Sequence, residues 1–191
     1  MKIGIIVGSV REGRTGTAVG RWVQEVAERH EGAEFELIEL SDFDLPLLTS
    51  PTIPGMAERN YDDERVTRWS QTVDSHDGFV FITPEYNHSI PGGFKNAFDS
   101  LAPEWMGKTV GFVSYGADHG VRAVEHWRTI VANFSMHAVR QQVSLGLFTE
   151  FGEDGLQLLD RREGELNTML DQLVDATRKM VLVEELAGAA N

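Results

Sequence analysis

The sequence contains no cysteine among its 191 residues. This absence excludes disulfide bonds, thiolate metal ligands and a cysteine nucleophile, and it fits a reducing compartment. Basic residues are also few: 17 Lys and Arg stand against 30 Asp and Glu, which gives a formal net charge of −13. So acidic a chain repels nucleic acid and anionic lipid, and neither is expected as a partner. Any site for an anion must therefore be built locally.

Long hydrophobic runs are missing as well. The first apolar run, Ile3–Val7, is interrupted by a glycine, and the N-terminal residues lack the apolar core of a signal peptide. No window approaches the roughly 20 apolar residues of a membrane span. We therefore expect a cytoplasmic protein with no membrane partner. With 41% hydrophobic residues, the chain is long enough for one core, and we predict a single domain over residues 1–191.

Short apolar runs alternate with segments of helical periodicity. The predicted strands are Ile3–Val7, Phe35–Leu40, Gly78–Ile82, Thr109–Ser114 and Ala138–Leu145. The predicted helices cover about residues 16–27, 62–75, 91–101, 121–133 and 161–186, and residues 41–60 are predicted as a long loop. Because a helix follows each strand, the pattern predicts an α/β fold with a five-stranded parallel sheet between helices on both faces. A ligand would then lie at the carboxyl ends of the strands.

A glycine-rich stretch, GSVREGRTG, occupies residues 8–16 directly after the first strand. It is not a dinucleotide fingerprint, because G-x-G-x-x-G requires a glycine where Val10 stands. It also resembles the G-x-x-x-x-G-K-[ST] loop of nucleoside-triphosphate enzymes, with Arg14 in place of the lysine. That alternative would make the protein a nucleotide hydrolase. However, the third and fourth predicted strands are not followed directly by the acidic residue that Mg²⁺ requires.

A third interpretation of this stretch is a loop for a single phosphate group. Hydroxyl side chains can donate hydrogen bonds, glycines let main-chain amides approach closely, and the following helix directs its positive end at the anion. Two arginines would neutralise the phosphate in this acidic chain; the alternative is that they are solvated turn residues. The candidate phosphate-binding residues are Ser9, Arg11, Arg14, Thr15, Gly16 and Thr17.

Two later loops carry the remaining candidates. Residues 83–93 (TPEYNHSIPGG) combine an aromatic ring, an amide, two prolines and two glycines, which suits a flat, hydrogen-bonding heterocycle. Residues 114–120 (SYGADHG) would supply the opposite edge. The cofactor-binding candidates of these two loops are Pro84, Glu85, Tyr86, Asn87, Ser114, Tyr115 and Gly116.

The motif P-E-Y-N-x-S-x-P-G-x-x-K-N-A, present as Pro84–Ala97, resembles the NADPH-dependent FMN reductase family of flavodoxin-like proteins. That family includes quinone, chromate and azo-dye reductases. The resemblance covers residues 3 to about 135 and implies a flavodoxin-like fold, with Pro84 to Asn87 against the isoalloxazine ring and Ser114 and Gly116 on its other side. The family's phosphate loop often reads G-S-x-R-x-G-S-x-N. Ser9, Arg11 and Thr17 are therefore supported by the resemblance, whereas Arg14 and Gly16 replace its second serine and its asparagine.

The resemblance implies an FMN-dependent oxidoreductase that passes a hydride from NADPH or NADH through FMN to a small-molecule electron acceptor. Quinones, azo dyes, metal oxyanions and free flavin are the candidate acceptors. No side chain is assigned as a catalytic acid or base, because the flavin carries the chemistry. The alternative is a flavodoxin-like electron carrier with little NAD(P)H activity. No metal site is expected from Asp118, His119 and His126, and His88 is expected to face solvent in its loop.

The resemblance also implies a homodimer or homotetramer formed through the helix Pro91–Leu101. Phe94 and Phe98 of that helix would lie at the interface, or else in the core of the protomer. Trp105 and Trp127 are likewise predicted in the core or at an interface.

Overall fold

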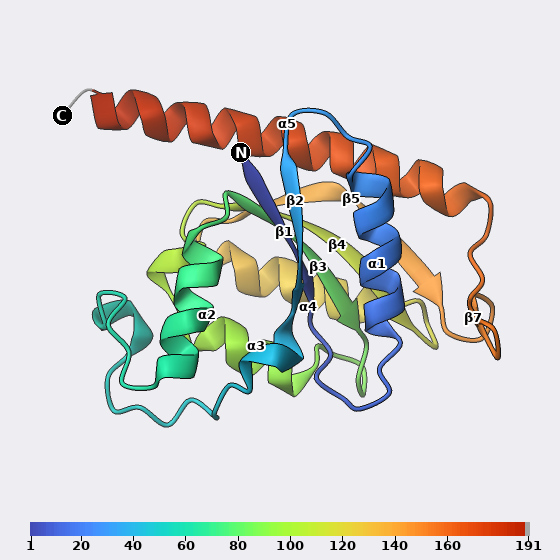
Figure 1. The fold of residues 1–191 in the computed structure, drawn as a ribbon, viewed down its shortest axis with the longest axis horizontal. Helices are drawn as coiled ribbons and strands as arrows, with labels where there is room; N and C mark the ends of the chain where they lie inside the picture. Colours follow the sequence, from blue (N-terminus) through green and yellow to red (C-terminus); the bar gives the residue numbers. More distant parts are fainter. Residues whose placement is uncertain (190–191) are drawn as a thin grey trace.

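The computed structural model describes residues 1–189 and contains one five-stranded sheet, in which every neighbouring pair of strands is parallel (Figure 1). The strand order is β2-β1-β3-β4-β5, the flavodoxin-like arrangement. The strands are β1 (Lys2–Val7), β2 (Glu34–Glu39), β3 (Gly78–Pro84), β4 (Thr109–Gly116) and β5 (His137–Gly146). The α-helices are α1 (Gly16–Ala27), α2 (Glu64–Asp74), α3 (Gly92–Asp99), α4 (Val121–Ala132) and α5 (Arg161–Ala189). The predicted α/β fold is confirmed.

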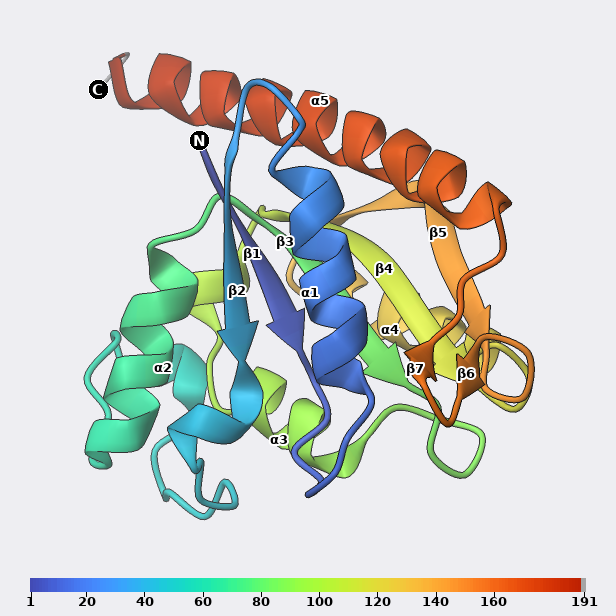
Figure 2. The same cartoon turned by 45° about the vertical axis from the view of Figure 1, so that its right-hand side comes forward.

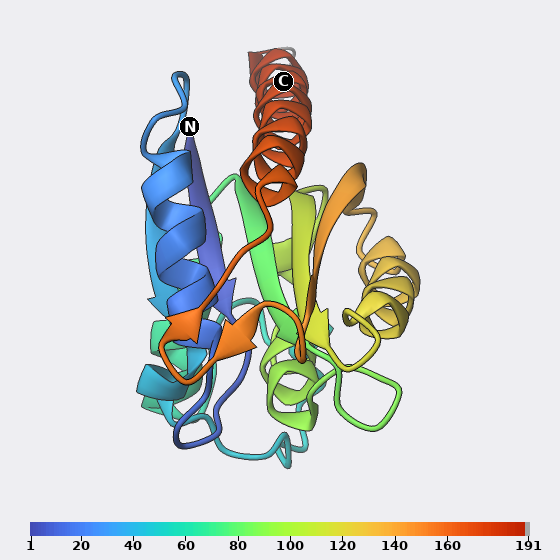
Figure 3. The same ribbon diagram turned by 90° about the vertical axis from the view of Figure 1, so that its right-hand side faces the viewer.

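Helices cover both faces of the sheet. Side chains of α1 and α5 pack on one face, and side chains of α2, α3 and α4 pack on the other, so that α1 and α4 lie on opposite sides in Figure 3. Successive residues of β3 alternate between the two faces: Val80 and Ile82 meet the first group of helices, whereas Phe79 and Phe81 meet the second. Because both faces are covered, every residue of β3 and β4 is buried, which explains their continuous apolar runs.

The face towards α3 and α4 holds all the fully buried Trp and Phe side chains. Phe94, Phe98, Trp105 and Trp127 are all 0% exposed, and the two indole N–H groups donate to main-chain and hydroxyl oxygens within the core. The core alternative is therefore confirmed for both tryptophans and both phenylalanines. The interface predicted through α3 cannot use the apolar stripe of this helix, because that stripe is already buried inside the protomer.

The element boundaries fall close to the predicted ones, with additions between them. Residues 41–60, predicted as a loop, contain two short 3₁₀ helices, η1 (Leu40–Phe43) and η2 (Pro54–Met56). A third, η3 (Pro103–Trp105), follows α3, and a small hairpin of β6 (Phe151–Gly152) and β7 (Gly155–Leu156) follows β5. Elements of two to four residues are too short to show periodicity, which is why the sequence did not reveal them.

The longest helix, α5, crosses the sheet near the amino ends of the strands (Figure 1). The arrowheads of the strands point to the opposite edge, where the loops after β1 and β3 lie (Figure 2). Within residues 1–189, no helix is both long and apolar enough to cross a membrane.

Candidate functional site at the carboxyl ends of the strands

Three loops meet where β1, β3 and β4 end, because these strands are neighbours in the sheet. The loop after β1 contacts the loop after β3 through a 2.8 Å hydrogen bond between Ser9 Oγ and the Tyr86 hydroxyl. The loop after β3 is joined to β4 by the Glu85 amide, which donates to the Tyr115 carbonyl at 2.9 Å. The predicted site residues, far apart in the sequence, therefore lie at one edge of the sheet.

The loop of residues 8–15, here named the phosphate loop, leads directly into α1. Ser9 is buried and Arg11 is exposed. Gly13 has a φ of 66°, a left-handed conformation that favours glycine, and a Cβ atom placed there would meet no atom within 4 Å. Within the described chain, the side chain of Thr15 does not cap the start of α1, and the first turn of that helix contains no acidic residue. The positive end of α1 therefore has neither a Thr15 side-chain cap nor an acidic residue in its first turn to offset it.

The hydroxyl group of Tyr115 also lies close to the start of α1. The residue is only 5% exposed, and a Cβ atom built on Gly16 would lie 2.8 Å from the Tyr115 hydroxyl oxygen. Glycine at position 16 therefore allows a close approach that a side chain would block. Burial, together with the nearby Tyr86 hydroxyl, raises the pKa of Tyr115. Its phenol consequently stays protonated and can donate a hydrogen bond.

The two arginines of the phosphate loop have different surroundings. The Arg11 guanidinium lies 5.8 Å from the centre of the Tyr86 ring, within the range of a cation–π contact. Arg14 instead turns towards the end of β2, where its Nε and Nη2 atoms donate to Glu39 Oε2 at 3.1 and 3.0 Å. A direct contact between Arg14 and a phosphate stays a prediction, and in this geometry its guanidinium is engaged elsewhere.

The loop after β3 folds into a tight turn. The Tyr86 and Ser89 main chains exchange two hydrogen bonds, of 2.9 and 3.1 Å. The two residues between them, Asn87 and His88, have φ values of 49° and 72°, as in a type I′ turn. Asparagine tolerates this left-handed conformation better than histidine, and such backbone strain costs about 1–3 kcal/mol per residue and is concentrated at functional sites. Both side chains at the tip are exposed, as expected for His88.

Glu85 points its side chain away from this turn. Its carboxylate, 5% exposed, accepts hydrogen bonds from the Arg122 amide at 3.1 Å and from Arg122 Nε at 2.6 Å. Arg122 also pairs with Asp118, and the pKa of Arg122 is raised by its hydrogen bond to Glu85 and by the charge of Asp118. Only the main chain of Glu85 is left for a ligand. Arg122 was not predicted, because an arginine in the first turn of a helix carries no signal without its distant partner.

Ser114 also has an internal role. It is 0% exposed, and its Oγ donates to the His119 carbonyl at 2.8 Å, which holds the loop after β4 in place. Gly120, with a φ of 74°, ends this loop, and a Cβ there would lie 2.8 Å from Ser114 Cβ. The predicted contact residues Glu85 and Ser114 therefore support the loops through their side chains, whereas Gly116 offers only main chain.

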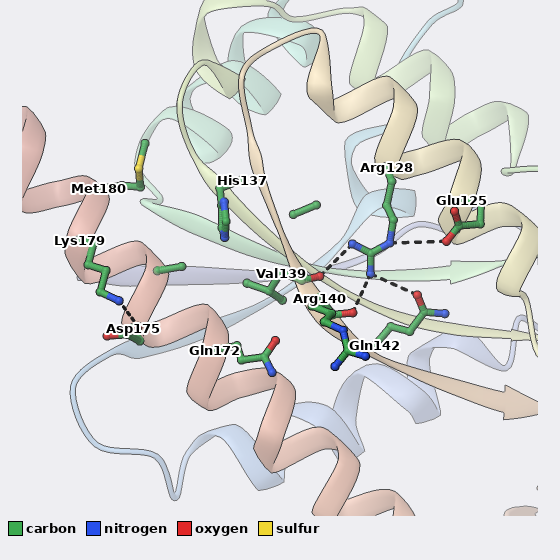
Figure 4. A pocket seen from close by; sticks show the side chains of 12 residues that line it. Glu125, Arg128, His137, Val139, Arg140, Gln142, Gln172, Asp175, Lys179 and Met180 are labelled. Atoms are coloured by element: carbon green, nitrogen blue, oxygen red, sulfur yellow. Dashed lines mark hydrogen bonds and ion pairs between the residues drawn. The ribbon is translucent and has the colours of Figure 1, made fainter.

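A wider hollow of about 820 Å³ lies away from these loops, between α4, the edge strand β5 and α5 (Figure 4). There Arg128 donates to the carbonyls of Val139 and Arg140 at 2.9 and 3.1 Å, and the Gln141 amide donates to Gln172 at 3.0 Å. These side chains cover the open polar groups of an edge strand, which is a common protection against strand pairing between molecules. Several polar side chains of this hollow are thus engaged with the edge strand, and the predicted site residues lie elsewhere, so we place the site at the carboxyl ends.

The residues considered for a metal have other partners or lie apart. Asp118 pairs with Arg122, and His126 Nδ1 forms a 2.7 Å hydrogen bond with Ser89. Among the residues whose side chains the structure describes, no group of three or more His, Asp or Glu could hold a metal ion.

The strand order and the converging loops define a protein of the flavodoxin-like class. Within this class, the NADPH-dependent FMN reductase family matches residues 1–150. The chain belongs to this family.

Relatives support the same assignment. The chain is 41% identical over 126 residues to the NAD(P)H-dependent FMN reductase ntnL of Nectria sp, an alignment that covers 64% of this chain and 63% of that protein. It is 39% identical over 119 residues to the NAD(P)H-dependent FMN reductase C4B3.06c of Schizosaccharomyces pombe, covering 62% and 60%. The chain thus spans about three fifths of these two proteins. The NAD(P)H-dependent FMN reductase LOT6 of Saccharomyces cerevisiae is 30% identical over 190 residues, covering 93% and 99%.

Solved structures share the fold. The flavoenzyme NAD(P)H:(acceptor) oxidoreductase FerB from Paracoccus denitrificans superposes with a TM-score of 0.74 at 23% identity, covering 94% of this chain and 98% of that one. RosB superposes with a TM-score of 0.72 at 14% identity, covering 100% of this chain and 86% of that one. At these identities the likeness establishes the architecture.

Proposed function

We propose that this protein is an NAD(P)H-dependent FMN oxidoreductase that reduces a small-molecule acceptor such as a quinone, an azo dye, a metal oxyanion or free flavin. Family membership supports the reaction class. The single structural observation that carries the proposal is the phosphate loop, whose hydroxyl and main-chain donors meet the uncapped start of α1 beside an exposed arginine.

The residues of the site fit FMN. Ser9, Thr15 and Thr17 supply hydroxyl groups near the start of α1, and Arg11 supplies the positive charge that a phosphate dianion requires. Gly13 and Gly92 leave open space in which a ligand can approach the main chain, since a Cβ on either would meet no atom within 4 Å.

The flavin ring would lie against Pro84, Tyr86, Asn87 and the main chain of Gly116. When bound, FMN would supply the redox chemistry, by accepting electrons from NAD(P)H and passing them to the acceptor. The chain itself would bind and orient the cofactor: the side chains of Glu85 and Ser114 hold the two loops in place, and the protonated Tyr115 phenol has one O–H that can donate a hydrogen bond. No side chain is required as an acid or base.

The proposed dimer needs an interface other than the apolar stripe of α3. Leu47, Ile53 and Met56 are 75%, 66% and 74% exposed in the segment between β2 and α2. Leu47 also lines a cavity of about 310 Å³ together with Val10 of the phosphate loop and Gly93 of α3. We infer that a second copy of the chain covers this exposed surface beside α3. Sedimentation of the Leu47→Asp, Met56→Asp double variant should shift towards the monomer.

The test of the function is an absorption spectrum of the purified protein, recorded before and after anaerobic addition of NADPH. A flavin spectrum that bleaches supports the oxidoreductase. A flavin spectrum that changes with neither NADPH nor NADH favours the electron carrier. A colourless protein that cannot be reconstituted with FMN contradicts both proposals.

The phosphate assignment has its own test. Arg11→Ala should weaken FMN binding by about 1.5–3 kcal/mol, the usual contribution of a charge-assisted hydrogen bond. Titration by quenching of flavin fluorescence measures this loss. Arg128→Ala, which removes an arginine from the distant hollow, is the matched control and should leave FMN affinity unchanged. Equal FMN affinity in the Arg11 and Arg128 variants would show that Arg11 is only a solvated turn residue.

A further inference from the structure

We propose that Arg14 is a positioning residue, which shapes the phosphate loop through Glu39 and so gives the protein its preference for a phosphorylated flavin. The proposal rests on the proposed function, in which this loop receives the phosphate of FMN. It differs from the expectation that Arg14 touches the phosphate itself.

The first support is the set of hydrogen bonds made by the Arg14 guanidinium. Besides its two bonds to Glu39 Oε2, Nη2 donates to Ser41 Oγ at 2.6 Å and Nη1 donates to the Arg11 carbonyl at 3.4 Å. One side chain thus joins the end of β2, the start of η1 and the turn of the phosphate loop. The bond to the Arg11 carbonyl acts on the residue whose side chain is proposed to bind the phosphate.

The second support is the environment of Glu39. The side chains of Arg14 and Glu39 are only 21% and 16% exposed. Glu39 Oε1 is a buried atom with no hydrogen-bond partner among residues 1–189. Arg14 is the ion-pair partner of this carboxylate, and the unpaired Oε1 adds no hydrogen bond that would stabilise the negative charge further. Without Arg14, a partly buried negative charge would remain next to a loop that must attract an anion.

This arrangement predicts a specific pattern of non-additive effects. Arg14→Gln removes the support of the loop and also leaves the Glu39 charge uncompensated, so FMN affinity should fall about 10- to 30-fold. Glu39→Gln removes only the support and should cost about threefold. In the double variant the repulsive charge is gone, so FMN should bind more tightly than it does to Arg14→Gln alone.

The experiment titrates flavin-free full-length protein with FMN and with riboflavin, followed by quenching of flavin fluorescence. Riboflavin lacks the phosphate, so its affinity should change less than twofold in all three variants. A merely structural role for Arg14 would instead weaken both flavins together. Arg14→Lys keeps the charge but not the forked geometry and should recover part of the lost FMN affinity. Arg21→Gln removes one positive charge from an exposed position on α1 and is the matched control.

The possible failures can be told apart. If the unmodified protein binds riboflavin as tightly as FMN, the phosphate assignment fails and this inference with it. If the unmodified protein prefers FMN and the Arg14→Gln variant keeps the full preference, only the role of Arg14 is refuted. Should Arg14→Gln fail to fold, Arg14→Lys and Glu39→Gln give the same comparison, since each changes the pair while keeping a side chain of similar size.

Discussion

Two of the arginine–glutamate pairs near the carboxyl ends of the strands differ in their surroundings. Arg14 and Glu39 join the phosphate loop to the end of β2, whereas Arg162 and Glu150 join α5 to the segment after β5. The side chains of the second pair are only 4% and 0% exposed, compared with 21% and 16% in the first. The same two residue types therefore stand in very different environments.

The hydrogen bonds of the two carboxylates differ even more. Glu150 accepts from Arg162 Nε at 2.7 Å on one oxygen, and from Arg162 Nη2 and the Gly146 amide, both at 2.8 Å, on the other. Glu39 accepts on one oxygen, and its other oxygen has no partner in the described chain. A fully satisfied buried pair fixes the architecture, since either member alone would be costly to bury. In the Arg14–Glu39 pair one carboxylate oxygen has no partner, and the pair lies beside the phosphate loop. We therefore expect this pair to affect the binding of FMN more than the stability of the fold.

The largest effect on the free energy of unfolding is expected when the buried Arg162–Glu150 pair is broken. Glu150→Gln would leave the buried Arg162 guanidinium with Glu165, which accepts from Nη1 at 2.6 Å, as its remaining negative partner, so the free energy of unfolding should fall by about 3 kcal/mol. Glu39→Gln should cost only about 1 kcal/mol, because Arg14 can still reach water and Ser41. Urea denaturation of both variants at pH 7 measures the difference. Equal losses of unfolding free energy would show that the deeper burial of the Arg162–Glu150 pair does not make it contribute more to stability than the Arg14–Glu39 pair.

The stabilising effect of Glu150 should also depend on pH. Burial by itself would raise the pKa of Glu150, but hydrogen bonds from Arg162 and from the Gly146 and Leu159 amides outweigh it, so the pKa lies below the ordinary value of 4.5. The stabilisation from this carboxylate is therefore complete above about pH 4.5 and is lost as the pH falls towards the lower, folded-state pKa.

The measurement is the free energy of unfolding from pH 6 down to pH 3. The unmodified protein should lose stability more steeply below pH 4.5 than the Glu150→Gln variant, which lacks this titrating group. Parallel curves for the two proteins would contradict the role assigned to Glu150.

The smallest effect concerns Ser41, which receives the 2.6 Å hydrogen bond from Arg14 Nη2. Ser41→Ala removes this acceptor while keeping the ion pair, so stability should fall by about 0.5–1 kcal/mol. FMN affinity should fall about two- to threefold with riboflavin affinity unchanged. Thr129→Ala, which removes an exposed hydroxyl from α4, is the control for loss of a hydroxyl group far from the loop. Equal losses of affinity for FMN and riboflavin would show that Ser41 does not contribute to recognition of the phosphate.

Most of the fold could be read from the sequence because its signals are local. A continuous apolar run such as that of β3 indicates a strand buried on both faces, and the helical spacing of Phe94 and Phe98 indicates a helix with one buried side. The same spacing does not say whether that side meets the core or another subunit. Only the packing of α3 against Trp127 decided this, with Phe94 and Trp127 ring centres 4.7 Å apart.

Some features of the site could likewise be predicted from the sequence, and others could not. The glycine pattern and the hydroxyl residues of the phosphate loop are adjacent in the chain, so the sequence by itself determined where this loop lies and that it precedes a helix. It could not determine which arginine faces the loop and which faces away. Glu39 is 25 residues from Arg14 and Arg122 is 37 residues from Glu85, so each pair exists only once parallel strands bring their carboxyl ends together. Local periodicity is carried by neighbouring residues, whereas hydrogen bonds between distant charges depend on the tertiary structure.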